Sequence, residues 1–225
     1  MRTKPLLCFL AASVGAVAIG FAADLYVLEH VARRDTNDTD WGQMFRSAGY
    51  IPTWCIVALG LLLVDLWAKP PAGRYRVTRG LTLAGSVWFA GVAAELLKLV
   101  TRRLRPDAEH PVLYAIRPFA EETYAASGMC LPSGHASVAF AAAFMLCRLH
   151  PGGAPVWLAI AAGCAATRLL MQAHYLSDVL AGAAVAYAVA WAIWQVHLLI
   201  VRPTTTPTTT ALRAPCRVSA LLVGA

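Results

Sequence analysis

Six apolar stretches dominate this chain and constrain its fold more than any other feature. They lie near residues 5–28, 51–68, 80–100, 132–149, 155–174 and 178–201. A helix needs about 20 apolar residues to cross the hydrocarbon core of a bilayer, and each stretch meets or approaches that length. Only 14% of the 225 residues are charged, whereas a soluble domain carries about 25%. The sequence therefore predicts an all-α, polytopic membrane protein with about six transmembrane helices in one bundle, formed by residues 1–201.

The two ends of the chain have their own patterns. Basic residues precede the first apolar stretch and small residues follow it near Ala22 and Ala23, a pattern that a cleavable signal peptide also shows. The apolar run is long for such a peptide, so a retained helix is the favoured interpretation. Residues 202–225 begin with a Thr/Pro-rich run and are predicted to form a short, disordered cytoplasmic tail.

Basic residues predict the orientation. With the N-terminus inside, most of them fall in inner segments, as the positive-inside rule requires: Arg2, Lys4, Lys69, Arg74, Arg76, Arg79, Arg148, Arg202, Arg213 and Arg217. The second outer segment breaks the trend and therefore needs another explanation. It holds Lys98, Arg102, Arg103, Arg105 and Arg117. This orientation predicts an integral membrane protein, of the inner membrane if the source is bacterial, with that segment facing the periplasm.

Composition argues against two other classes of function. The net charge of +7 is small and its basic residues form no single stripe, so nucleic acid is not an expected partner. Four cysteines fall inside apolar stretches, and the chain has no CxxC pair and no Cys/His spacing suited to zinc. We therefore predict buried apolar cysteines and no metal site.

The first polar cluster is KLVTRRLRP, residues 98–106. Lys98 and Arg105 are seven positions apart, or two helical turns, and would share a face of a helix that Pro106 ends or bends. Two cations at the membrane surface can grip a phosphate. Taken alone, the cluster also fits side chains that reach out to lipid headgroups.

The second polar cluster is CLPSGHAS, residues 130–137, which opens the fourth apolar stretch. A helix that begins at Ser133 and Gly134 exposes backbone N–H groups suited to an anion, with His135 in its first turn. Taken alone, it also fits an ordinary helix start capped by Ser133.

The third polar cluster is TRLLMQAHYLSD, residues 167–178. His174 and Asp178 are four apart and can share a helical face, where the carboxylate would fix one imidazole nitrogen and leave the other free to attack. Arg168 is six positions before His174, so both can reach one phosphate only if the chain bends between them. Taken alone, the pair also fits a helix end held by a His–Asp contact, with Ser177 as a cap.

Topology brings the three clusters together. With six crossings, the connection between the third and fourth stretches and the connection between the fifth and sixth lie on the same side of the membrane. Three cations, two histidines, one carboxylate and a backbone anion site are then expected at one place. Asp24 and Asp65, near the ends of their stretches, are interpreted as interface residues, and Glu95 is expected to pair with Lys98.

In order and spacing the clusters resemble the three-part signature of the type 2 phosphatidic acid phosphatase superfamily. The matching positions are Lys98, Arg105, Pro106, Pro132, Ser133, Gly134, His135, Arg168, His174 and Asp178. One position departs, because the third motif often begins Ser-Arg and here is Thr167-Arg168. Thr keeps the hydroxyl, so little change is expected.

The resemblance implies a role for each of these residues. His174 would form a phosphohistidine, Asp178 would orient it and His135 would protonate the leaving oxygen. The phosphate ligands would be Lys98, Arg105, Ser133, Gly134 and Arg168. Because protein cations neutralise the phosphoryl charge in such a site, no metal or other cofactor is expected.

The sequence is compatible with several hypotheses about the activity. A membrane lipid phosphate or diphosphate phosphatase is the first of them. A lipid phosphotransferase with the same site, a vanadate-dependent haloperoxidase, and a transporter or scaffold with a vestigial site are the others. Phosphatidic acid, phosphatidylglycerol phosphate, undecaprenyl diphosphate and lipid A phosphates remain equal candidates as substrate.

Overall fold

The computed structural model of the protein describes residues 4–31, 33–67, 78–106, 114–120, 126 and 128–201. Within these ranges the helices are α1 (Lys4–His30), η1 (Arg34–Asp38), α2 (Asp40–Ser47), α3 (Ile51–Trp67), α4 (Thr78–Thr101), α5 (Gly134–Leu149), η2 (Pro151–Gly153), α6 (Ala154–Leu170) and α7 (Leu176–Val201). The same residues contain no named strand, only two isolated β-bridges. The all-α prediction is therefore confirmed. The predicted tail, 202–225, lies outside the described residues.

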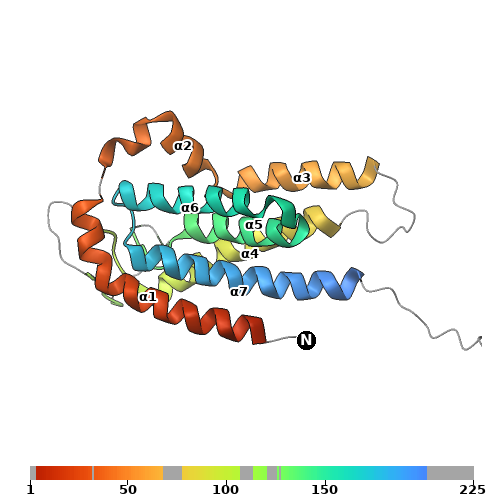
Figure 1. The fold of residues 1–225 in the computed structure, drawn as a ribbon. Helices are drawn as coiled ribbons and strands as arrows, with labels where there is room; N and C mark the ends of the chain where they lie inside the picture. The colour runs from red at the N-terminus through yellow and green to blue at the C-terminus, as the bar shows by residue number, and fades with distance from the viewer. Residues whose placement is uncertain are drawn as a thin grey trace, which may run out of the picture.

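Each of the six predicted stretches forms a long helix, and these helices run side by side in one bundle (Figure 1). Four are long and apolar enough to cross a membrane. The pair α2 and α3, bent by 65°, would make a fifth. Helix α5 has 16 residues, about 24 Å at 1.5 Å per residue, which is shorter than a bilayer core of about 30 Å. The protein is thus polytopic, and the count of six crossings stays a prediction.

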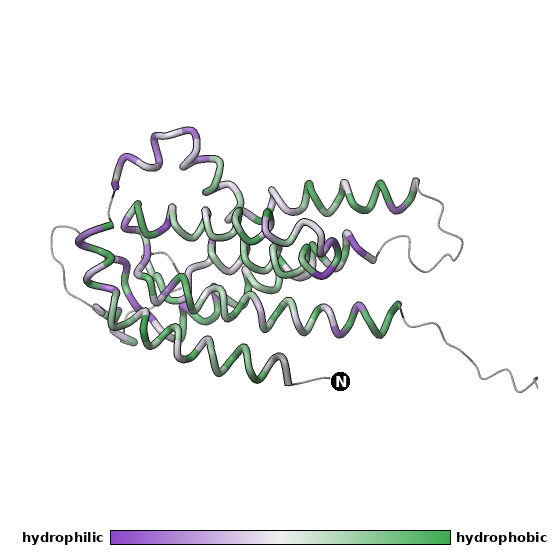
Figure 2. The backbone as a smooth tube through the Cα atoms, viewed as in Figure 1, coloured by the Kyte–Doolittle hydropathy of each residue, from purple (hydrophilic) through white to green (hydrophobic). Residues whose placement is uncertain are grey.

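Large apolar side chains cover the outside of the bundle. Ile56 is 72% exposed, Trp67 is 85% exposed and Leu199 is 62% exposed, and many similar residues surround them. Figure 2 shows the same apolar character along the long helices, with hydrophilic residues gathered at α2 and at the end of α1. Soluble proteins rarely expose apolar patches on this scale. The outer faces of the helices are therefore suited to lipid.

Helix α5 lies in the middle of the bundle and packs against α4, α6 and α7. Its interior face is built from small residues, with Ala136, Ala139 and Ala142 fully buried. Gly182 of α7 belongs to the same packing, because a Cβ atom there would lie 2.8 Å from the carbonyl oxygen of Ser133. Small residues let helices approach closely without any hydrophobic force between them in lipid. This close packing brings the start of α5 against the start of α7.

Two buried carboxylates correct the interpretation of Asp24 and Asp65 as interface residues. Asp24 in α1 is 0% exposed and Asp65 in α3 is 4% exposed. Asp65 forms an ion pair with Arg79 that joins α3 to α4.

Helix α1 packs against α7, where Phe9 stacks on Tyr187 with ring centroids 3.7 Å apart. The retained helix stays a prediction.

The end of the bundle that carries the α4–α5 and α6–α7 connections is predicted to face away from the cytoplasm. Figure 1 places both connections at the end where α1 finishes, opposite the N-terminus. A periplasmic reporter enzyme fused after residue 120 is expected to be active, because the positive-inside rule leaves residues 69–79 in the cytoplasm. A matched fusion after residue 72 is expected to be inactive. An active reporter at 72 together with an inactive one at 120 would reverse the orientation.

Candidate active site

A cavity of about 620 Å³ opens at this end of the bundle. Its polar wall contains five of the eight predicted site residues, and its apolar wall comes from α3 and α4. The five are Lys98, Arg105, Gly134, His135 and His174. The other three, Ser133, Arg168 and Asp178, are buried behind that wall with exposed fractions of 0%, 4% and 0%. The structure thus brings together residues that are far apart in the sequence.

Lys98 and Arg105 reach the cavity in a different way from the one predicted. Helix α4 ends at Thr101, because Arg102 adopts a left-handed conformation with a φ of 51°. Lys98 therefore lies in the last helical turn and Arg105 in the loop that follows, so they do not share a helical face. The left-handed Arg102, and not Pro106, therefore ends helix α4. Both side chains nevertheless line the same cavity.

The start of α5 supplies the backbone part of the site. Ser133 is the N-cap, and its hydroxyl accepts a 3.5 Å hydrogen bond from the N–H of Ala136. The first N–H groups of a helix have no intrahelical acceptor, so those of Gly134 and His135 are available to an anion. A Cβ atom at Gly134 would lie 3.1 Å from Glu95 Oε1 and 3.4 Å from Lys98 Nζ. Glycine at this position therefore leaves room for the Glu95–Lys98 pair beside the helix start.

His135 is enclosed by the corner between α2 and α3. Its ring meets Tyr50 edge-on, with centroids 4.9 Å apart. A Cβ atom at Gly49 would lie 2.5 Å from His135 Cδ2, so only glycine permits this approach. His135 Nε2 is buried and has no hydrogen-bond partner. An unsatisfied nitrogen in a cavity wall is available to a ligand.

His174 lies in the break between α6 and α7, and its side chain is 2% exposed. Its Nδ1 is 3.0 Å from the carbonyl oxygen of Cys130. A carbonyl only accepts, so Nδ1 carries the proton and Nε2 keeps its lone pair. Burial lowers the pKa of His174, and the nearby Asp178 opposes that effect. The neutral imidazole, which is the nucleophilic form, is therefore favoured.

Asp178 stands behind His174 at a longer distance than a hydrogen bond. Its Oδ2 is 3.6 Å from His174 Nδ1 and accepts a 2.9 Å hydrogen bond from the N–H of Tyr175. The two residues do not share a helical face, because α7 begins at Leu176. The carbonyl of Cys130 is thus the direct hydrogen-bond partner of the imidazole. The Asp178 carboxylate influences the ring through its charge, from just outside hydrogen-bond distance.

Arg168 supplies a third cation from the last turn of α6. The bend that the sequence required between Arg168 and His174 is present, since α6 ends at Leu170 and Gln172 has a φ of 52°. The Arg168 Nε atom is buried without a partner. Its side chain faces His135 closely enough for their charges to interact.

Two of the three cations at the site have no carboxylate partner among the described residues. Lys98 Nζ is 2.6 Å from Glu95 Oε1, as expected from the sequence. Among the described residues, Arg105 and Arg168 form no ion pair at all. Uncompensated cations beside a helix start make an attractive site for a multiply charged anion.

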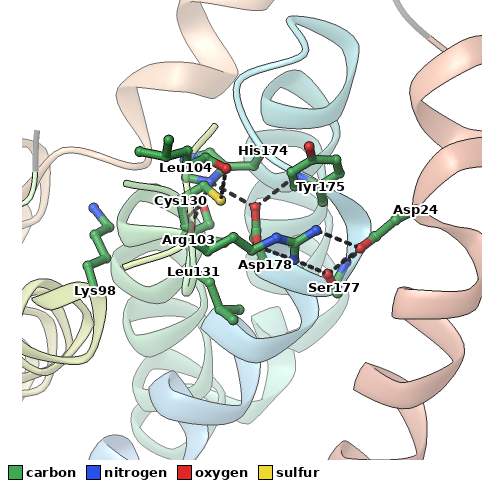
Figure 3. Close-up of polar contacts among 12 residues, drawn as sticks. Asp24, Lys98, Arg103, Leu104, Cys130, Leu131, His174, Tyr175, Ser177 and Asp178 are labelled. Atoms are coloured by element: carbon green, nitrogen blue, oxygen red, sulfur yellow. Dashed lines mark hydrogen bonds and ion pairs between the residues drawn. The ribbon is translucent and has the colours of Figure 1, made fainter. Parts of the chain in front are cut away.

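Sequence reasoning missed a buried polar cluster behind His174, shown in Figure 3. Arg103, which the sequence left among the basic residues of the second outer segment without a role, has a side chain only 4% exposed. It lies between Asp24 and Asp178, and Ser177 contacts the same group. Asp24 comes from a helix 79 positions earlier in the chain, and no spacing rule links such distant residues. The exception that Arg103 made to the charge trend was the available signal.

The described residues contain no group of three or more His, Cys, Asp or Glu side chains placed to hold a metal ion. The five cysteines among them are unpaired. Cys164 is buried as predicted and Cys147 is partly buried, but Cys8 and Cys55 are exposed, so the predicted burial is wrong for these two. Cys130 is buried against the carbonyl oxygen of Leu104, 3.0 Å from its Sγ atom. The site consists of imidazole, guanidinium, ammonium, carboxylate and backbone groups.

Known bacterial proteins resemble parts of the chain. It is 39% identical over 108 residues to proteins named lipid A 1-phosphatase from Rhizobium etli and Rhizobium johnstonii, covering 47% of the chain and 44% and 42% of the two relatives. The match thus spans less than half the length of each. It is 32% identical over 139 residues to the decaprenylphosphoryl-5-phosphoribose phosphatase of Mycobacterium tuberculosis, covering 62% of the chain and 71% of that protein.

The sequence profile of the PAP2 superfamily matches residues 79–202, which is more than half of the chain. The matched region includes every predicted site residue, from Lys98 to Asp178. It also includes the cavity wall from α4, the start of α5 and the break before α7. The chain belongs to the PAP2 superfamily.

Proposed function

We propose that the protein is a membrane phosphatase that hydrolyses a lipid-linked phosphate or diphosphate through a phosphohistidine at His174. The observation that carries this proposal is the cavity in which unbalanced cations surround two histidines. His174 presents an unprotonated Nε2, and His135 presents a buried nitrogen without a partner. An anion is held by the cations, a nucleophile faces it, and a second imidazole is placed to handle protons.

The first chemical step forms the phosphoenzyme. His174 Nε2 attacks phosphorus while the bond from phosphorus to the lipid oxygen breaks. His135, which must be protonated for this step, gives its proton to the leaving oxygen, so no free alkoxide is released. The negative charge of the bound phosphate favours that protonated form. Lys98, Arg105, Arg168 and the first N–H groups of α5 neutralise the charge on the three phosphoryl oxygens. The Nδ1–H of His174 remains on the Cys130 carbonyl, and Asp178 stabilises the positive charge that develops on the ring.

The second step restores the enzyme. Water attacks the phosphohistidine, the bond from nitrogen to phosphorus breaks, and His135 accepts the proton that the water loses. Inorganic phosphate leaves with the oxygen of that water. Both histidines then return to their starting protonation states, so the cycle needs no metal ion or other cofactor.

The apolar wall of the cavity supports a lipid substrate. Trp88, Val92 and Leu96 line it from α4 and are 56%, 43% and 59% exposed, so the same wall continues onto the lipid-facing surface. An acyl or prenyl chain can therefore stay in the bilayer while its phosphate enters the cavity. The names of the relatives, lipid A 1-phosphatase and decaprenylphosphoryl-5-phosphoribose phosphatase, agree with a lipid-linked phosphate as substrate.

The location of the site follows from the proposed orientation. In a bacterial inner membrane the cavity would face the periplasm, where it would meet lipid phosphates of the outer leaflet. The proposed catalytic residues are His174, His135 and Asp178, and the proposed phosphate ligands are Lys98, Arg105, Ser133, Gly134 and Arg168. Ser133 contributes through the cap that sets the start of α5, because its hydroxyl is fully buried.

A haloperoxidase is disfavoured because enzymes of that kind are soluble, whereas this bundle exposes apolar side chains over its outer faces. Transfer of the phosphoryl group to an acceptor lipid would use the same first step. It would differ only in replacing water by a lipid hydroxyl in the second step.

Phosphate release by the purified protein in detergent tests the proposed activity. We expect turnover of at least one lipid from a panel of lipid A, a polyprenyl-linked phosphoribose, phosphatidic acid, phosphatidylglycerol phosphate and undecaprenyl diphosphate. Activity should persist in excess EDTA, and vanadate should inhibit by mimicking the five-coordinate transition state. His174→Ala serves as the control and should form no phosphoenzyme. A strict requirement for Mg²⁺ would contradict the mechanism.

The leaving group separates the roles of the two histidines. A lipid alkoxide needs a proton on departure, whereas nitrophenolate is stable as an anion, and general acid catalysis contributes about 10²–10⁴-fold. His135→Ala is therefore expected to slow phosphoenzyme formation far more on a lipid phosphate than on nitrophenyl phosphate. His174→Ala should lose both reactions alike, since attack is common to them. Equal losses for His135→Ala on both substrates would make His135 a phosphate ligand and not the acid.

A further inference from the structure

The cluster behind His174 joins three separate segments of the chain through one guanidinium. Arg103 Nη2 donates to Asp24 Oδ2 at 3.0 Å, and Arg103 Nη1 donates to Asp178 Oδ1 at 2.9 Å. Nη1 also lies 2.7 Å from the hydroxyl oxygen of Ser177. The face of the guanidinium rests on the ring of Tyr175, 3.9 Å from its centroid. Figure 3 shows this arginine between α1 and the start of α7, turned away from Lys98.

Asp24 satisfies its hydrogen-bonding capacity entirely within this cluster. Its Oδ1 accepts the N–H of Ser177 at 2.8 Å, and its Oδ2 accepts the Ser177 hydroxyl at 2.5 Å. Helix α1 therefore fixes both the main chain and the side chain of the residue next to Asp178. The carboxylate is 0% exposed and does not line the cavity.

Arg103 reaches His174 by a second route, through the main chain. Its carbonyl accepts a 2.8 Å hydrogen bond from the N–H of Cys130, and the carbonyl of Cys130 holds His174 Nδ1 at 3.0 Å. One residue thus sets the position of both groups that face the protonated side of the imidazole.

The charges in the cluster do not cancel. Two carboxylates share one guanidinium, which leaves one negative charge behind the ring. If Asp24 were neutral, Arg103 would compensate Asp178 fully, and the field that stabilises a positive imidazole would be lost. We propose that Asp24 and Arg103 form a positioning pair that fixes Asp178 and the Cys130 carbonyl on His174 and maintains a net negative charge behind it, without contacting the substrate. The proposal rests on His174 being the nucleophile.

The test compares phosphoenzyme formation by Asp24→Asn and Asp24→Glu with the wild type. Asp24→Asn keeps the size of the side chain and removes its charge. We expect a loss of about 10–100-fold in the rate of phosphoenzyme formation, with vanadate affinity little changed, because misplacement of a reacting group by about 1 Å costs on that order. Asp24→Glu keeps the charge and should recover part of the rate.

A matched control is available at the other end of the bundle. Asp65 is also a buried aspartate on an apolar helix and also pairs with an arginine, Arg79. Asp65→Asn should lower the yield of folded protein and leave the rate per folded molecule unchanged. Asp24→Asn should instead lower the rate per folded molecule, measured on the monodisperse fraction from gel filtration in detergent.

The pH profile supplies a readout that a purely structural role would not move. The groups that face His174 are Asp178 from α7, Arg168 from α6, Arg105 from the loop after α4, and His135 from α5. The folded pKa of His174 is lowered, so the wild-type rate should fall on acidification only below about 6.5, at constant substrate dianion concentration. Removing a nearby negative charge disfavours the imidazolium further. The acid limb of Asp24→Asn should therefore move to lower pH.

The outcomes separate this proposal from the proposed function. If the wild type forms no phosphoenzyme, the proposed function fails. If it does, and folded Asp24→Asn reacts at the wild-type rate with the wild-type pH profile, only the positioning pair is overturned. If Asp24→Asn does not fold, Ser177→Ala removes the hydrogen bonds that the Ser177 hydroxyl makes with Asp24 and Arg103, while keeping all three charges and the main-chain bond to Asp24. Wild-type rates for Ser177→Ala and Asp24→Glu together would then overturn the proposal, and a reduced rate in either would support it.

Discussion

The arrangement of the active-site end depends on one buried guanidinium, that of Arg103. A charge in a low-dielectric interior is tolerated only when it is paired and hydrogen-bonded, and removing one partner of a buried pair typically costs about 3–5 kcal/mol. Arg103 meets this condition only if α1, the start of α7 and the loop after α4 adopt their observed positions together. The ionic cluster therefore selects one arrangement of segments that small-residue packing alone would hold less specifically.

This pairing divides the basic residues at the membrane surface into two kinds. Both Nη atoms of Arg103 are engaged by carboxylates, and its side chain is buried behind His174, away from an incoming anion. Arg105 and Arg168 have no carboxylate partner in the described residues, and Lys98 shares only the exposed Glu95. The basic residues of this one segment therefore have two roles: Arg103 holds the fold together, and Lys98 and Arg105 are available to bind phosphate. The distinction rests on where the carboxylates are, because the cations themselves are chemically alike.

Much of this end of the molecule followed from the sequence, for reasons that can be stated. The lengths of the apolar stretches located the helices, and an even number of predicted crossings between the connections placed the three motifs at one end. The sequence did not predict the local backbone geometry or the ion pairs between distant residues. The end of α4 is set by a left-handed Arg102, where Pro106 was the visible signal. The partner of Asp24 lies 79 positions away. The periodicity of a sequence indicates which face of a helix is apolar. It does not indicate which charged residue of another helix will lie against that face.

The break before α7 shows how a nucleophile is held at the edge of a membrane. On a continuous helix Arg168 and His174 would point to different sides, so the chain must unwind between them. Unwinding exposes backbone groups that lipid cannot satisfy. Here the Tyr175 N–H, at the N-cap of α7, is accepted by Asp178 Oδ2 from the third helical position, as in a capping box. The Asp178 carbonyl accepts the N–H of Ser133. The carboxylate that faces His174 is therefore also what allows the chain to break where His174 is needed.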